Sequence, residues 1–153
     1  MRYATLLLLS TLALSSCRRA ASTVEDAQAR LLAPDHWQIS EVYINDALSY
    51  KDGKTREHFG GVNFNRYMEK VYFRPEGTFE GYYKGETEAK VLRWSAQTDQ
   101  ILVAAPDDST QAGAWSIRPG DVYDDSFEMK VQSTAYDYPN LTRIALKFVK
   151  AER

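Results

Sequence analysis

The sequence is poor in the residues that carry most catalytic and metal chemistry. It contains one cysteine, Cys17, and two histidines, His36 and His58. A single cysteine forms no internal disulfide, and a thiolate metal or redox site needs partner ligands that this sequence does not supply. Each histidine lies in a polar, turn-like stretch, and neither pattern indicates a Ser/His/Asp triad. We therefore predict no catalytic residue, no metal site, no cofactor and no enzymatic activity.

An excess of one charge is also missing. The chain has 19 lysines and arginines against 21 aspartates and glutamates, and the basic residues are scattered among the acidic ones. A nucleic-acid partner would need a basic face, so none is expected. The acidic segment with Asp121, Asp124 and Asp125 lacks the glycine-bearing loop and final glutamate of a recognised calcium site, and a solvated loop is predicted there instead.

Long apolar runs are absent except near the N-terminus. After Arg2, residues 3–14 form an apolar block of about a dozen residues, well short of the roughly 20 that span a bilayer as a helix. This is the length typical of a signal peptide. The block ends in Leu-Ser-Ser-Cys at residues 14–17, which resembles the lipobox of bacterial lipoproteins.

The lipobox resemblance implies a signal peptide over residues 1–16, cleavage before Cys17, and a diacylglyceryl group on its sulfur with a further acyl chain on the new N-terminus. Three acyl chains would hold the protein permanently on a membrane. In that class, aspartate after the cysteine favours the inner membrane, whereas this sequence has Arg18. The resemblance therefore implies the outer membrane of the bacterial cell envelope. The alternative is a simple secretory signal peptide that is cleaved at another position, in which case Cys17 has no role in membrane attachment.

The remaining sequence predicts a short tether, one helix and then strands. Residues 17–22 are interpreted as a lipidated, flexible tether and residues 23–153 as one domain. Ser22 and Glu25 form a capping-box pattern that predicts a helix to about Leu32, before Pro34. Strands are predicted over 36–44, 67–73, 78–84, 89–96, 101–105, 113–118, 126–133 and 141–149, with a possible short one at 47–50. The turn residues Pro75-Glu76-Gly77 predict a hairpin between the second and third of these strands, and residues 97–100 separate two runs that predict another.

Strands in succession without interleaved helices indicate an antiparallel meander. About eight twisted strands with one apolar face close most easily into an up-and-down barrel, because closure removes exposed edges. The predicted fold class is therefore all-β, a barrel with a short N-terminal helix. A flattened sandwich or half-open barrel is the nearest alternative.

Three segments resemble the small bacterial lipocalin-like (calycin-type) lipoproteins: HWQISEVYIND, FRPEGTFEGYY and VLRWSAQTDQILVAA. Asp35 occupies the position of the glycine in the lipocalin Gly-x-Trp signature. Lipocalins place a late basic residue against the first-strand tryptophan, here Trp37, and the resemblance makes Arg143 and Lys147 the candidates on the last strand. It implies a barrel that holds a small ligand.

Aromatic side chains offer the candidate ligand site. Strand alternation predicts that seven of them face the interior, where they either fill the core or line a cavity for a small hydrophobic or amphipathic ligand. These candidates are Trp37, Tyr43, Phe73, Phe79, Tyr83, Trp94 and Phe127. The alternative function is a protein-interaction lipoprotein, an accessory subunit or inhibitor, with a filled core. It would dock through loops or through an outward face with Tyr72 and Tyr82.

Overall fold

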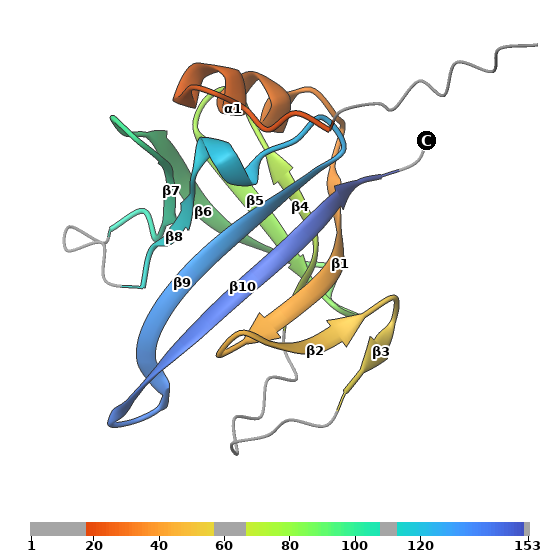
Figure 1. Cartoon of the computed structure of the whole chain (residues 1–153), viewed down its shortest axis with the longest axis vertical. Coiled ribbons are helices and arrows are strands. Elements are labelled where there is room, and N and C mark those ends of the chain that lie inside the picture. Colours follow the sequence, from red (N-terminus) through yellow and green to blue (C-terminus); the bar gives the residue numbers. More distant parts are fainter. Residues whose placement is uncertain (1–17, 57–66, 108–112, 152–153) are drawn as a thin grey trace, which may run out of the picture.

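The computed structural model describes residues 18–56, 67–107 and 113–151 (Figure 1). The predicted signal peptide, Cys17 and His58 lie outside these residues. The described elements are α1 (Val24–Leu32), β1 (Trp37–Ile44), β2 (Ala47–Lys51), β3 (Lys54–Thr55), β4 (Met68–Phe73), β5 (Thr78–Tyr83), β6 (Ala89–Ala96), β7 (Ile101–Ala104), β8 (Trp115–Ile117), the 3-10 helix η1 (Pro119–Asp121), β9 (Ser126–Asp137) and β10 (Asn140–Lys150).

The sheet closes on itself through β1. One edge of β1 pairs with β10 along its length, and its other edge pairs with β4 near Trp37 and with β2 near Ile44. From β4 to β10 each strand pairs with the next, all antiparallel. Strands β1 and β4–β10 therefore form a closed eight-stranded, lipocalin-like barrel, which confirms the predicted fold class over a sandwich or half-open barrel. Strands β2 and β3 extend the sheet from the far half of β1.

A β-bulge in β1 changes which side chains face the interior. The register with β10 shifts between Ile39, opposite Phe148, and Glu41, opposite Lys147. Ser40 is the extra residue, and its hydroxyl donates to the carbonyl of Lys147 at 3.0 Å. A bulge reverses the alternation of every later residue in the strand.

The predicted inward orientation of Tyr43 is therefore wrong. Val42 and Ile44 are buried opposite Leu146 and Ile144, whereas Tyr43 lies opposite Ala145 on the outer face. Period-two alternation counted through Ser40 assigns Tyr43 to the wrong side, because a bulge adds one residue without interrupting the run of strand-forming side chains.

The two predicted hairpins are present between β4 and β5 and between β6 and β7. In the first, Gly77 has φ +85°, a conformation that favours glycine, and its N–H donates to the carbonyl of Arg74 at 3.0 Å. The indole Nε1 of Trp94 donates to the same carbonyl at 2.8 Å. In the second, the N–H of Gln97 donates to the carbonyl of Gln100. The alternating runs on either side of each turn predicted both hairpins, with the turn residues Pro75 and Gly77 as a further signal for the first.

Helix α1 covers one end of the barrel (Figure 1). It buries Val24, Ala27 and Leu31, one stripe at helical spacing. The indole Nε1 of Trp37 donates to the carbonyl of Leu31 at 3.0 Å, which ties the helix to the first barrel strand. The N-cap is Thr23 rather than the predicted Ser22, and its hydroxyl accepts from the N–H of Asp26 at 3.1 Å.

Candidate functional site

Five of the seven predicted interior aromatics fill the barrel near α1. Trp37, Phe73, Phe79, Trp94 and Phe127 are all buried in the core. Phe73 packs edge-on against Phe79, Trp94 and Phe127, with ring centroids 5.1, 6.2 and 5.6 Å apart. Because these rings are in contact with one another, they act as core packing at this end.

The opposite end of the barrel carries tyrosines. Tyr50 on β2 and Tyr67 just before β4 are both buried, with ring centroids 4.7 Å apart. Tyr83 at the end of β5 is half-buried against the core, and Tyr136 near the end of β9 is 44% exposed. We call these four residues the tyrosine end. Met68, opposite Tyr83, is buried beside them.

Burial dominates the electrostatics of the tyrosine end. It raises the pKa of Tyr50, and a hydrogen bond with Tyr67 raises it further, while the charge of Lys84 lowers it. Burial also raises the pKa of Tyr136, with Tyr83 as the second cause. The phenols of Tyr50 and Tyr136 therefore stay protonated near neutral pH and present hydroxyl groups within an aromatic surround.

Of the four residues of the tyrosine end, only Tyr83 was predicted from the sequence as a ligand contact. Tyr50 lies in the weak strand pattern at 47–50, and Tyr136 lies beyond the predicted end of its strand at residue 133, because β9 continues to Asp137. The tyrosine content, ten in the chain, was the available signal. It does not say at which end of a barrel the rings meet.

The outer face beside the bulge carries an ion-pair network around Glu41. Its carboxylate accepts from Lys51 Nζ at 2.8 Å, Lys147 Nζ at 3.1 Å and the Tyr43 hydroxyl at 2.9 Å. The hydrogen bond from Lys51 is the largest cause that lowers the pKa of Glu41 to about 2, against the opposing effect of burial. A carboxylate held ionised in this way is a structural anchor for β1, β2 and β10.

Neutralising Glu41 is expected to destabilise the fold in a pH-dependent manner. Its pKa is lower in the folded chain than the usual 4.5, so its stabilisation is complete above about pH 4.5 and is lost as the pH falls towards 2. We expect Glu41→Gln to cost about 1–2 kcal/mol at pH 7, since the exposed lysine heads screen part of the interaction. Urea unfolding at pH 7 and pH 2.5 measures it.

The exposed Glu88→Gln variant is the control for this titration and should unfold like the parent at both pH values. A Glu41→Gln deficit that stays the same at pH 2.5 would contradict an electrostatic origin and point to altered packing instead.

The late basic residues do not contact the first-strand tryptophan. Lys147 pairs with Glu41, and Arg143 Nη2 pairs with Asp46 Oδ2 at 2.6 Å, both on the outer face. Trp37 points into the interior and is bonded to α1. The expected packing of Arg143 or Lys147 on Trp37 is therefore wrong, because alternation along β10 directs these side chains away from the interior.

His36 lies in an aromatic patch on the outer surface. Its ring stacks on Tyr72 with centroids 5.3 Å apart, and its Nδ1 lies 2.9 Å from Asp35 Oδ2. Tyr72 also packs edge-on against Tyr82, at 5.7 Å, and Arg74 lies over its face, at 4.7 Å. The predicted outward Tyr72/Tyr82 face is thus present. In the described part of the chain, no group of three or more His, Cys, Asp or Glu side chains is placed to hold a metal ion.

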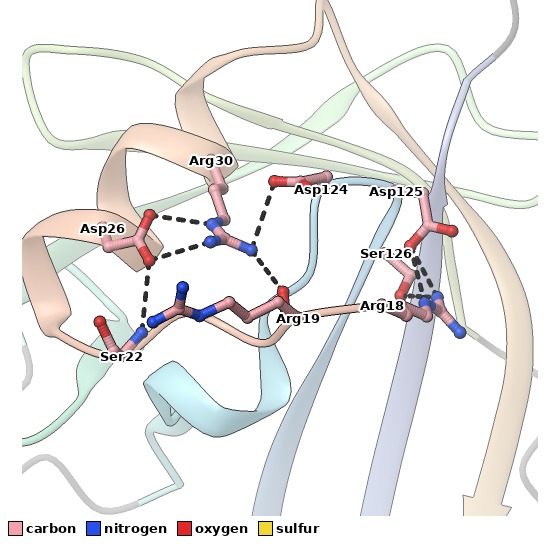
Figure 2. Close-up of polar contacts among 8 residues, drawn as sticks. All are labelled: Arg18, Arg19, Ser22, Asp26, Arg30, Asp124, Asp125 and Ser126. Atoms are coloured by element: carbon pink, nitrogen blue, oxygen red, sulfur yellow. Dashed lines mark hydrogen bonds and ion pairs between the residues drawn. The ribbon is translucent and has the colours of Figure 1, made fainter. Parts of the chain in front are cut away.

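The segment after Cys17 is packed onto the barrel rather than free. Figure 2 shows Arg18 reaching Asp125 and Ser126, and Arg30 bridging Asp26, Asp124 and the carbonyl of Arg19. The interpretation of residues 18–22 as a flexible tether is therefore wrong. Asp124 and Asp125 are exposed, as the predicted solvated loop requires. The three aspartates also form ion pairs: Asp121 with Lys130, and the other two with the arginines of Figure 2.

No family model and no curated protein matches this sequence. Among solved structures, the chain is similar to a deswapped triple mutant of bovine odorant-binding protein. The identity is 14% and the TM-score 0.44, over 81% of this chain and 76% of that one. Nothing in the described residues forms a helix of the length and apolarity that a bilayer crossing requires. The lipocalin-like fold therefore rests on the strand order and closure of this barrel.

Proposed function

We propose that this protein is a lipid-anchored, non-enzymatic binding module of the bacterial cell envelope, which holds a small amphipathic ligand at the tyrosine end of its barrel. The observation that carries the proposal is the grouping of Tyr50, Tyr67, Tyr83 and Tyr136 at one end. Ligand sites combine apolar walls with a few placed polar groups, and tyrosine supplies both.

Exposure at the tyrosine end is graded. Tyr50 and Tyr67 are buried, Tyr83 is half-buried, and Tyr136 is 44% exposed. An amphipathic molecule matches this gradient: its apolar part would pack against the deeper pair of rings, and its polar part would meet the outer phenols and water. The other end offers no equivalent, because α1 covers it and the aromatic core fills it.

The envelope location is supported by the N-terminal pattern. Leu-Ser-Ser-Cys follows an apolar block of signal-peptide length, and Cys17 is the single cysteine of the chain. Arg18 after the cysteine favours the outer membrane in the lipoprotein class. Of the seven aromatics predicted as ligand contacts, only Tyr83 belongs to the proposed site. Its other members are Tyr50, Tyr67 and Tyr136.

Binding of the fluorescent amphipathic probe N-phenyl-1-naphthylamine tests the ligand site. The chain from residue 18 onward should give a saturable rise in probe fluorescence. Tyr67→Ala removes one aromatic wall of the site and should lower the affinity for the probe roughly tenfold, as expected for the loss of a buried aromatic contact. Tyr136→Ala, at a partly exposed position, should weaken it less without risk to the core.

The matched control is Tyr138→Ala, since Tyr138 is 85% exposed at the tip of the β9–β10 hairpin. It should leave the probe affinity unchanged. A parent protein without saturable binding, or equal affinities for the parent and both tyrosine-end variants, would overturn the proposed ligand site.

The β9–β10 hairpin favours a second candidate function, docking of an envelope protein. The hairpin projects beyond the barrel (Figure 1), and its tip exposes Tyr138 and, at 52%, Leu141. Exposed apolar side chains at a projecting tip are typical of contact surfaces. A photo-crosslinking amino acid at position 138 should capture one stoichiometric partner in intact cells if this function holds, and capture nothing reproducible if it does not.

A further inference from the structure

The first residues after Cys17 are fixed to the barrel by several contacts that act together. Arg18 Nε and Nη2 donate to Asp125 Oδ1 at 3.0 and 2.7 Å, and Nη2 also donates to the Ser126 hydroxyl. The guanidinium lies 4.8 Å from the ring centre of Tyr123. The N–H of Ala21, a buried residue, donates to the carbonyl of Val122 at 2.7 Å. We call this arrangement the clasp.

A second arginine fixes the middle of the segment. Arg30 Nη1 donates to the carbonyl of Arg19 at 2.7 Å. Asp26 holds the same guanidinium through Nε and Nη2, at 2.9 and 3.0 Å, and Asp124 lies 3.3 Å from Nη1 (Figure 2). A single exposed ion pair contributes little, but here backbone bonds, a buried alanine and two arginines constrain the same few residues.

From these contacts we infer that the clasp is a rigid bracket, which holds the lipidated protein with its α1 end against the bilayer and its tyrosine end pointing away. The inference rests on the proposed lipidation of Cys17. That residue precedes Arg18 directly, and consecutive Cα atoms lie about 3.8 Å apart. A free leash of five residues would instead allow a reach of up to roughly 17 Å.

The direction follows from where the clasp meets the fold. Asp125 and Ser126 lie where β9 begins, and the carbonyl of Asp125 accepts from the N–H of Lys150, where β10 ends. Figure 1 shows this end of the two strands beside α1 and the hairpin tip at the opposite end. β9 has 12 residues, a length of up to roughly 40 Å at the usual rise. A ligand at the tyrosine end would therefore exchange with the aqueous side rather than with the anchoring bilayer.

Headgroup charge is not the orienting force in this arrangement. Arg18 is paired with Asp125, and Arg30 with Asp26 and Asp124, so these two arginines are matched by carboxylates, and the exposed Arg19 is the further cation of this segment. Covalent attachment next to a fixed residue sets the direction instead. The orientation should be the same on neutral phosphatidylcholine vesicles and on vesicles that contain anionic phosphatidylglycerol.

Energy transfer from the protein to the bilayer tests the orientation. The full chain is produced and lipidated in a bacterial host and reconstituted into phosphatidylcholine vesicles that carry a headgroup-linked acceptor dye. A donor dye is attached at Ala29→Cys on α1 in one sample and at Tyr138→Cys on the tip in another; both positions are exposed. Transfer should be at least about twofold stronger from position 29, given the length of β9.

Breaking the clasp should abolish this difference. The double variant Asp125→Ala/Arg30→Ala removes both the partner of Arg18 and the side chain that holds the Arg19 carbonyl, without altering the residue next to Cys17. It should raise transfer from position 138 towards that from position 29. The matched control, Glu80→Ala, removes another surface arginine–carboxylate pair, Arg74–Glu80 at 2.9 Å, and should preserve the difference.

The outcomes separate the two proposals. An intact mass without acyl chains would refute the lipid anchor and this inference with it. A lipidated protein whose two donors transfer equally, or whose difference survives the double variant Asp125→Ala/Arg30→Ala, would overturn the bracket alone and leave the lipid anchor and ligand site standing.

Discussion

Phe127→Ala is expected to destabilise the barrel by about 3–5 kcal/mol, the range for removing a large buried aromatic. The Phe127 ring packs on Trp37 and Phe148, with centroids 5.0 Å away in each case, and on Phe73 at 5.6 Å. The substitution removes contacts with β1, β4 and β10 at once. The cavity that it leaves lies at the end of the barrel covered by α1, where the neighbouring rings have little freedom to move in and fill it. Urea unfolding followed by tryptophan fluorescence measures the loss.

Two further variants show whether the loss of stability comes from removing the buried Phe127 ring. Phe127→Leu retains most of the volume and should cost much less than the alanine variant. Leu141→Ala removes an exposed apolar side chain on β10 and should change stability by less than about 0.5 kcal/mol. A loss below about 1 kcal/mol for Phe127→Ala would mean that the aromatic cluster is not tightly packed.

Cys17→Ser is expected to remove the protein from the membrane. If Cys17 carries the acyl chains, cells grown with radioactive palmitate should label the parent, and the serine variant should show only background. Each buried methylene contributes roughly 0.8 kcal/mol to membrane attachment, so loss of the chains should move the protein into the aqueous fraction, apart from any uncleaved precursor.

Ser16→Ala is the control for the lipidation test. It keeps a small residue before the cysteine and should be labelled like the parent. Equal label in the parent and in Cys17→Ser would contradict lipid attachment at this residue and favour a simple secretory peptide.

The sequence predicted the barrel because its signals were local. The turn at Pro75-Glu76-Gly77, the alternation in residues 126–133 and the capping pattern before the helix each act over a few residues. The strand order then followed from short connections between antiparallel neighbours. Even so, the N-cap lay one residue later than predicted, at Thr23, because Thr23 and Asp26 make a pattern equivalent to that of Ser22 and Glu25.

The misplaced features depend on contacts between distant residues. The bulge at Ser40 is defined by its register against β10, and it moved Tyr43 to the outer face. The clasp joins Arg18 to Asp125 across 107 positions, and no local pattern distinguishes it from a free tether. The tyrosine end unites β2, β5, β9 and the residue before β4. Proximity of this kind comes from the closed barrel and not from periodicity.

Native mass spectrometry of the lipidated protein, purified from cell membranes in a mild detergent, tests most directly whether the barrel holds a ligand. We expect a retained small molecule in addition to the covalent acyl chains, present in the parent and in Tyr138→Ala but depleted in Tyr67→Ala. A parent protein that carries its acyl chains and no further mass under the same conditions would contradict the claim that this barrel holds a ligand.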